Sequence, residues 1–201
     1  MVPLRDTASR RRVPIATLSI IVINVIVFVN QLSMPYDGAI EMLYKYAFIP
    51  SRFVDGLTQI ESYIPLFTSM FIHGDMMHII SNMWSLWLFG DNVEERMGFF
   101  GFITFYILTG LIAGFAHFVS NPMSNIPTVG ASGAIAGVMG AYFIMFPHAR
   151  IVTLVPFIPF VLRVPAPIFL FIWFISQLRS GIYGMVGGVA WWAHIFGFLA
   201  G

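Results

Sequence analysis

Residues 130–147 read GASGAIAGVMGAYFIMFP, a stretch without a single charged side chain. At 1.5 Å per residue, a helix of this length approaches the hydrocarbon thickness of a membrane, about 30 Å. Its small residues recur every four positions, which places them on one face of a helix. A helix face lined by small residues lets another helix backbone approach closely inside a membrane. The stretch therefore predicts a tightly packed membrane helix.

The composition of the whole chain agrees with this prediction. Only 9% of the 201 residues are charged and 58% are hydrophobic, whereas a typical soluble domain is about 25% charged. So few charges cannot cover a globule with a water-facing surface, and lipid must therefore cover much of it. The net charge of +1 and the lack of a long basic run give no sign of nucleic-acid binding. The absence of cysteine excludes disulfides and thiolate metal sites.

Six apolar segments are candidates for membrane-spanning helices. In chain order they are residues 14–31, 76–92, 99–119, 131–147, 164–180 and 185–201. We therefore expect an all-α polytopic membrane protein, a bundle of six transmembrane helices covering residues 14–201. Residues 1–13 would form a cytoplasmic N-terminal tail. No clear small-residue cleavage site follows the first apolar run, so we expect a retained helix rather than a signal peptide.

The connection between the first two segments is unusually long. Residues 32–75 carry scattered charges that argue against a span, and aromatic side chains that argue against a plain linker. We expect a long interfacial loop that lies along the membrane surface, and a solvated loop is the alternative. A second connection, residues 148–163, contains Pro156 and Pro159, which argue against a continuous helix.

The distribution of basic residues predicts the orientation, because short cytoplasmic loops carry an excess of lysine and arginine. With the N-terminus inside, seven basic residues fall on the inner side: Arg5, Arg10, Arg11, Arg12, Arg96, Arg150 and Arg163. Three fall outside: Lys45, Arg52 and Arg179. We expect an integral protein of a prokaryotic cell membrane with a cytoplasmic N-terminus. His78, Ser132 and His194 would then share the outer half, with His194 about ten residues, or roughly 15 Å, into its helix.

Ser132 and His194 are the residues best suited to chemistry in this bundle. Polar and ionisable groups inside a membrane are costly and are therefore candidates for function. A serine alone is a poor nucleophile, but a neutral imidazole beside it can take its proton. Small residues share the helix faces of both: Gly133, Ala136, Gly137 and Gly140 near Ser132, and Gly197 and Gly201 near His194. Packing of these faces would bring hydroxyl and ring together, although such stripes also serve ordinary helix packing.

His78 and Asn82 are candidates for stabilising negative charge. They are four residues apart, so they share one face of a helix. Acyl transfer places negative charge on the former carbonyl oxygen, and fixed hydrogen-bond donors must meet it. The backbone N–H of Ser132, at the start of a helix, is a further donor. The alternative for Asn82 is an ordinary hydrogen bond between membrane helices.

The sequence lacks the residues that other hydrolytic mechanisms require. No Asp or Glu occurs in the last four apolar segments, so a Ser–His dyad is expected rather than a triad. The chain also lacks a His-Glu-x-x-His zinc motif and a pair of intramembrane aspartates. We therefore expect no metal and no cofactor.

Together these residues resemble the rhomboid family of intramembrane serine proteases. The resemblance covers residues 64–201 and rests on an ordered set of short motifs. These are Thr68-Ser69-Met70-Phe71-Ile72-His73-Gly74, His78-x-x-x-Asn82, Phe89-Gly90-Asp91-Asn92-Val93-Glu94, Gly130-Ala131-Ser132-Gly133 and Ala193-His194-x-x-Gly197-x-x-x-Gly201.

The resemblance implies a protease that cuts single-span transmembrane proteins within or near the lipid bilayer. It implies that Ser132 is the nucleophile, that His194 is the general base, and that His78, Asn82 and the Ser132 backbone hold the oxyanion. Glu94 and Arg96 would brace the interfacial loop and the inner end of the second helix. The fifth helix and a loop at 176–186 would correspond to the lateral gate and the cap.

Two features depart from the family pattern, and the last residue gives a separate expectation. Many members carry an aromatic residue four positions after the serine, where it stacks on the histidine, but this chain has Ala136. Many members carry Trp-Arg where this chain has Ile64-Pro65. Gly201 ends the chain without the polar flank that a last helix normally has, which predicts a trimmed C-terminus.

Two other functions compete with proteolysis. A transporter or channel also buries polar groups at mid-depth, but it needs a polar path to both faces. The inner halves of the fourth and sixth segments are apolar and rich in glycine, which disfavours such a path. A non-catalytic rhomboid-like binding protein would lack the serine or the histidine. The substrate's identity and the oligomeric state are not predicted.

Overall fold

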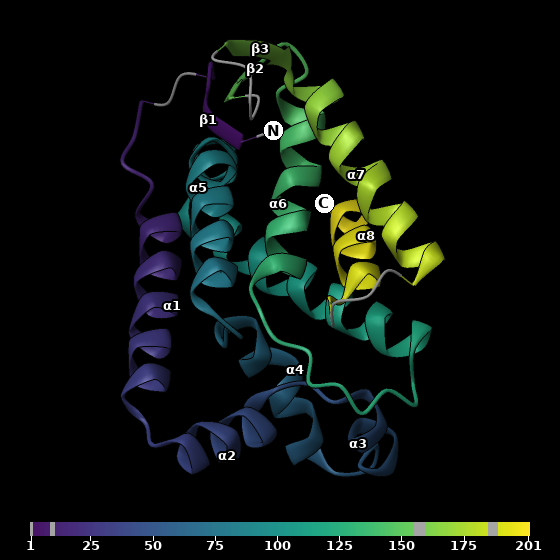
Figure 1. The fold of residues 1–201 in the computed structure, drawn as a ribbon. Coiled ribbons are helices and arrows are strands. Elements are labelled where there is room, and N and C mark those ends of the chain that lie inside the picture. Colours follow the sequence, from purple (N-terminus) through teal and green to yellow (C-terminus); the bar gives the residue numbers. More distant parts are fainter. Residues whose placement is uncertain (1, 9–10, 155–159, 185–188) are drawn as a thin grey trace.

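Helix α6, Ser132–Met145, lies in the middle of the helical bundle (Figure 1). The computed structural model describes residues 2–8, 11–154, 160–184 and 189–201. Three helices pack against α6: α5 Met76–Ser120, α7 Ala166–Tyr183 and α8 Trp191–Ala200. Helix α1, Ile15–Ser33, packs against α5. Every residue from Gly133 to Tyr142 is buried, so the tightly packed helix predicted from residues 130–147 is confirmed.

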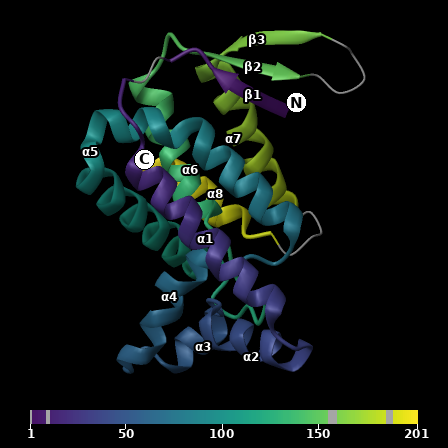
Figure 2. The same ribbon diagram turned by 90° about the vertical axis from the view of Figure 1, so that its left-hand side faces the viewer.

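Helix α5 consists of two helices joined at a bend. At Gly98 the backbone leaves the helical conformation, with φ 75° and ψ 169°. A residue with a Cβ rarely adopts such a positive φ, so glycine permits the sharp turn. The two arms, visible in Figure 2, correspond to the second and third apolar segments of the sequence.

The described helices are those of a polytopic membrane protein. Three of them, α1, α5 and α7, are long and apolar enough to cross a membrane, and α6 and α8 are apolar but shorter. The expectation of a mostly helical membrane bundle is therefore confirmed. The number of six spans stays a prediction.

Helix α7 is longer than the sequence predicted. It continues to Tyr183, so most of the stretch expected as a loop at 176–186 is helical. Residues 185 and 186 of that stretch lie outside the described ranges. The expected end at residue 180 was wrong because Gly181 does not break the helix, which instead ends at Gly184 in the left-handed conformation, φ 58°.

A three-stranded antiparallel sheet corrects the expectation of an all-α fold. Its strands β1 Val2–Asp6, β2 Arg150–Leu154 and β3 Val161–Pro165 pair in the order β1-β2-β3. It lies at one end of the bundle (Figures 1 and 2). The expected tail therefore begins as a strand, and the side chain of its Asp6 accepts hydrogen bonds from Asn92 and Tyr142. The alternation that marks a strand is weak in segments of five residues, which is why the sequence analysis missed it.

The long connection between α1 and α5 folds at the other end of the bundle. It contains α2 Tyr36–Tyr46, α3 Pro50–Asp55, the 3₁₀ turns η1 Ile60–Tyr63 and η2 Ser69–Phe71, and α4 Ile64–Thr68. Its aromatic side chains pack together around Phe53, whose ring contacts Phe48, Tyr63 and Phe118 at centroid distances of 5.0–5.4 Å. This packing explains why the segment is too aromatic for a plain linker. Its position along the membrane surface stays a prediction.

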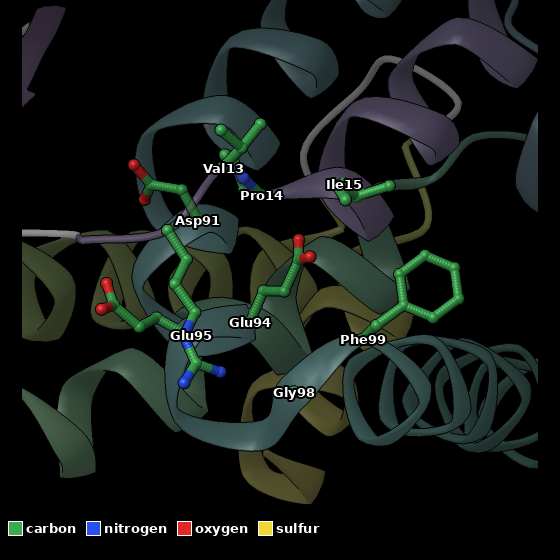
Figure 3. Close-up of a pocket in the computed structure, with 9 residues that line it drawn as sticks. Val13, Pro14, Ile15, Asp91, Glu94, Glu95, Gly98 and Phe99 are labelled. Atoms are coloured by element: carbon green, nitrogen blue, oxygen red, sulfur yellow. The ribbon is translucent and has the colours of Figure 1, made fainter.

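Glu94 holds the start of α1 against α5. Its buried carboxylate accepts hydrogen bonds from the N–H groups of Ala16 (2.9 Å) and Thr17 (2.8 Å). Figure 3 shows this region, where Glu94 extends toward the beginning of α1. The carboxylate supplies the cap that Pro14, at the N-cap position, cannot provide. Glu94 thus braces α1 rather than the interfacial loop, and Arg96 lies over the Phe146 ring at 5.4 Å.

Glycines bring the backbones of α6 and α8 into direct contact. A Cβ on Gly197 of α8 would overlap the Gly133 carbonyl of α6, and a Cβ on Gly201, just after α8, would overlap the Gly137 carbonyl. A Cβ on Gly140 of α6 would overlap the Phe198 carbonyl of α8. No larger residue fits at these positions, so the small residues set the distance between the two helices.

Candidate active site

Ser132 and His194 meet where α6 and α8 begin. Ser132 is the first residue of α6, and His194 is the fourth residue of α8. The His194 Nε2 and the Ser132 Oγ are 2.8 Å apart, a hydrogen-bond distance. Both side chains are only partly buried. His194 lies nearer the start of its helix than the ten residues expected, because α8 begins at Trp191 rather than at residue 185.

The other ring nitrogen of His194 contacts a residue that the sequence analysis missed. The Nδ1 of His194 lies 2.8 Å from the Oε1 of Gln177, a buried residue on α7. An amide oxygen can accept a hydrogen bond from the Nδ1 of a histidine, as a carboxylate does. A usable signal was present, since Gln177 is the only amide side chain in the apolar segment 164–180, and a polar group in a span is a candidate for function.

Two tryptophans flank the His194 ring. The Trp173 ring of α7 lies over it at a centroid distance of 6.2 Å and an angle of 31°. The Trp191 ring stands edge-on at 6.0 Å and 88°. The aromatic contacts that Ala136 cannot supply therefore come from α7 and from the start of α8. Ala136 itself is fully buried and faces Gly197 of α8.

His78 and Asn82, on the first arm of α5, face the turn that leads into α6. Gly130 adopts φ 116° in this turn, and a Cβ there would lie 2.6 Å from the His78 Nε2 and 3.5 Å from the Asn82 Nδ2. The close approach and the positive φ both require glycine. Three elements, the first arm of α5, the turn and the start of α6, thus bring polar groups to one place.

Two side-chain donors face this turn, and one of them, the Asn82 Nδ2, has no protein acceptor in the described ranges. The Asn82 Nδ2 is buried without a hydrogen-bond partner, a condition that costs about 1–3 kcal/mol for a buried donor. The Nδ1 of His78 accepts from the Gly74 N–H at 3.4 Å, so a neutral ring carries its proton on Nε2, toward Gly130. The Ser132 N–H, at the first position of α6, adds a third donor. Such a set suits an anionic oxygen.

A small cavity adjoins Ser132. It has a volume of about 30 Å³, enough for a water molecule. Small residues line much of it, among them Gly110, Ala113 and Gly114 of α5. The space beside the serine hydroxyl therefore suits a small group.

A further histidine, His73, lies next to His78. The His73 ring lies 5.1 Å from that of His78, is fully buried, and has no hydrogen-bond partner for either nitrogen in the described ranges. Burial, reinforced by the nearby His78, lowers the pKa of His73 from 6.5 to about 4. His73 is therefore neutral at physiological pH. Within the described ranges, no group of three His, Asp or Glu side chains is placed to hold a metal ion.

Comparison with known proteins gives a family match. The family model described as "Rhomboid domain" matches residues 61–201. The chain is 29% identical over 117 residues to "Rhomboid protein 1, mitochondrial" of Saccharomyces cerevisiae, covering 56% of this chain and 32% of that protein. It is 31% identical over 100 residues to "Presenilin-associated rhomboid-like protein A, mitochondrial" of Danio rerio, covering 48% and 26%.

A bacterial relative is also similar. The "Putative rhomboid protease YdcA" of Bacillus subtilis is 34% identical over 80 residues, which cover 40% of each chain. The matched parts thus span between about a quarter and two fifths of the length of these relatives. Because the family model covers more than half of the sequence, and because the relatives carry the same family name, the chain belongs to the rhomboid family.

Proposed function

We propose that this protein is an intramembrane serine endopeptidase that uses a Ser132–His194 dyad. The observation that carries the proposal is the 2.8 Å contact between the Ser132 Oγ and the His194 Nε2, inside a bundle of apolar helices. An imidazole at this distance can accept the hydroxyl proton as the oxygen attacks a carbonyl carbon. Family membership supports the same chemistry.

The reaction proceeds in two halves. In the first, the His194 Nε2 takes the Ser132 proton while the Oγ forms a bond to the carbonyl carbon of the peptide. The tetrahedral intermediate collapses, the C–N bond breaks, and His194 returns the proton to the leaving amine. In the second half, His194 takes a proton from water while the water oxygen attacks the acyl carbon. The ester bond to Ser132 then breaks, and His194 returns the proton to the Ser132 Oγ. The products are an amine and a carboxylic acid.

Three donors would stabilise the negative oxygen of each intermediate. They are the Asn82 Nδ2, the His78 Nε2 and the Ser132 N–H. The first two flank Gly130, and within the described residues the Asn82 Nδ2 has no protein acceptor to compete with the substrate. Loss of one such donor typically costs about 10²–10³ in kcat.

The proposed substrates are single-span transmembrane proteins. A peptide bond inside an intact helix has its carbonyl engaged, so the substrate must unwind locally before Ser132 can attack. The cavity of about 30 Å³ beside Ser132 favours a small side chain at the cleaved bond. The substrate would approach between the first arm of α5 and α7, through membrane lipid.

We further propose that the protein lies in a cell membrane with its N-terminus in the cytoplasm. The active site would then open toward the outer side, because α6 and α8 begin at their ends that face away from the sheet (Figure 1). Water for hydrolysis would reach Ser132 from that side.

A serine-directed fluorophosphonate probe tests the proposal on the detergent-solubilised protein. We expect Ser132 to be labelled in the wild type, labelling to vanish in Ser132→Ala, and its rate to fall at least tenfold in His194→Ala. Cleavage of a reconstituted single-span substrate should follow the same order. Equal labelling of all three proteins would refute the dyad, and a wild type that is neither labelled nor active would favour a non-catalytic rhomboid-like binding protein.

A further inference from the structure

We propose that Gln177 is a positioning residue that fixes the tautomer and the orientation of His194. This inference rests on the proposed function, because it concerns the base of that reaction. It starts from the 2.8 Å contact between the Gln177 Oε1 and the His194 Nδ1. With no acid in the last four apolar segments, the amide takes the place that a carboxylate holds in a triad.

The hydrogen bonds around Gln177 determine which way its amide faces. The Ser176 hydroxyl donates its only proton to the Trp173 carbonyl, at 2.6 Å. Toward Gln177 the hydroxyl can therefore offer only a lone pair, which accepts from the Gln177 Nε2 at 3.0 Å. The amide nitrogen is thereby committed to Ser176. The carbonyl oxygen is left to face His194.

This orientation decides the protonation of the imidazole. A carbonyl oxygen can only accept, so the His194 Nδ1 must carry a proton. In the neutral ring the Nε2 then has a free lone pair, and this nitrogen faces the Ser132 Oγ at 2.8 Å. The opposite tautomer would place an N–H against the serine and could not take its proton. When His194 becomes protonated during the reaction, Nδ1 keeps its donor role and the Gln177 carbonyl dipole stabilises the charge.

Helix α7 also sets the plane of the ring. Trp173 and Gln177 are four residues apart, so they lie on the same face of α7. The tryptophan ring lies beside the imidazole, with the centroids 6.2 Å apart, while the Gln177 Oε1 contacts the His194 Nδ1. A partly buried hydrogen bond and a ring contact from the same helix leave the imidazole little freedom to rotate.

Two substitutions at Gln177 separate positioning from packing. Gln177→Met keeps the length and removes the acceptor, while Gln177→Glu restores an acceptor for the Nδ1 proton. We expect Gln177→Met to lower kcat about 10- to 100-fold with little change in KM, the range for loss of a residue that orients a functional histidine. Gln177→Glu should recover part of that loss. Packing alone would predict the opposite order, because a buried glutamate fits an apolar site worse than methionine does.

A spectroscopic measurement makes the test independent of activity. Long-range ¹H–¹⁵N spectra of histidine-labelled protein in micelles distinguish the two neutral tautomers, and the His194→Ala variant identifies the His194 signals. We expect the wild type to show only the Nδ1-protonated form and Gln177→Met to show a mixture. An unchanged spectrum and unchanged kcat in Gln177→Met would overturn the inference. A wild type inert toward probe and substrate would instead overturn the proposed function, while the spectrum would still decide whether Gln177 holds the ring.

Discussion

Asn82 is a buried amide whose nitrogen has no protein acceptor in the described ranges. A side chain kept for stability would not leave a donor unpaired, since this costs about 1–3 kcal/mol. The oxyanion role explains the arrangement, because the donor is paired only when substrate is present. We therefore expect Asn82→Ala to lower kcat by about 10²–10³ while the melting temperature stays unchanged or rises.

Asn92, on the same helix, provides the matched control. Its Nδ2 donates to Asp6 at 2.9 Å, far from Ser132 in the chain. Asn92→Ala should lower the melting temperature and leave the rate of fluorophosphonate labelling close to that of the wild type. If Asn82→Ala instead behaves like Asn92→Ala, the ordinary packing role of Asn82 is correct.

The lowered pKa of His73 predicts how the stability of the folded protein depends on pH. The folded protein lowers the pKa of His73 from 6.5 to about 4, so between these values the unfolded chain binds a proton that the folded protein does not. The contribution of His73 is complete above pH 6.5 and is lost as the pH falls toward 4, by about 3 kcal/mol in total at 1.36 kcal/mol per pH unit.

Melting temperatures measured in detergent between pH 4 and 7.5 check this prediction. His73→Phe should flatten the slope between pH 6.5 and 4, since the ring forms no hydrogen bond in the described ranges that phenylalanine would lose. His148 is exposed, and His148→Ala should keep the wild-type slope. Equal slopes in all three proteins would contradict a neutral His73.

At the residue scale the sequence predicted the pairing of Ser132 and His194, because each lies on a helix face lined by small residues. Such faces pack closely, and this packing brings the two side chains together. Gln177 was not predicted, because the expectation of a dyad rested on the lack of acids, and an amide can also accept the hydrogen bond from Nδ1. The tryptophans were missed for another reason. Trp173 is 21 positions before His194 along the chain, and only the packing of α7 on α8 brings the rings together.

At the scale of elements, the contact between α6 and α8 depends on glycine. A Cβ on Gly197 would overlap the Gly133 carbonyl, which is backbone and cannot move aside without shifting a helix. Such a shift would also separate Ser132 from His194. We expect Gly197→Ala to lower the melting temperature by several degrees and the labelling rate at least tenfold, since a misplacement of about 1 Å can cost 10² in rate.

Gly38 in α2 offers the comparison for this effect. A Cβ there would meet its nearest atoms at 3.9 Å, an ordinary contact. Gly38→Ala should leave activity unchanged and stabilise the protein slightly, by about 0.4–1 kcal/mol, because alanine restricts the unfolded chain. If Gly38→Ala lowers the melting temperature and the labelling rate as much as Gly197→Ala does, the activity does not depend specifically on the α6–α8 contact.

The elements that the sequence predicted are the long apolar ones. A helix that crosses the lipid needs about 17 or more apolar residues in a row, and few other structures need such a run. Long apolar segments are therefore easy to recognise in the sequence. The sheet was not predicted, because β1 and β2 are separated by more than 140 residues and each has only five. Short strands are defined by their partners, and pairing between distant segments leaves little trace in either one.

At the scale of the whole molecule, the two ends of the bundle differ in chemistry. The sheet end carries Arg5, Arg150 and Arg163 on its strands. The other end carries the aromatic segment from α2 to α4 (Figure 2). Basic residues favour the cytoplasmic side, so the sheet is expected inside and the dyad is expected near the outer surface.

The absence of cysteine makes this orientation directly testable. Gln59 lies in the connection that contains α2 to α4, His148 lies just before β2, and both are exposed. In intact cells, a membrane-impermeant maleimide should label Gln59→Cys and should label His148→Cys only after the membrane is broken. Both variants should keep wild-type fluorophosphonate labelling, since neither residue belongs to the proposed site. The reverse pattern would place the dyad on the cytoplasmic side, where hydrolytic water would reach Ser132 from the cytoplasm and the positive-inside argument would fail for this chain.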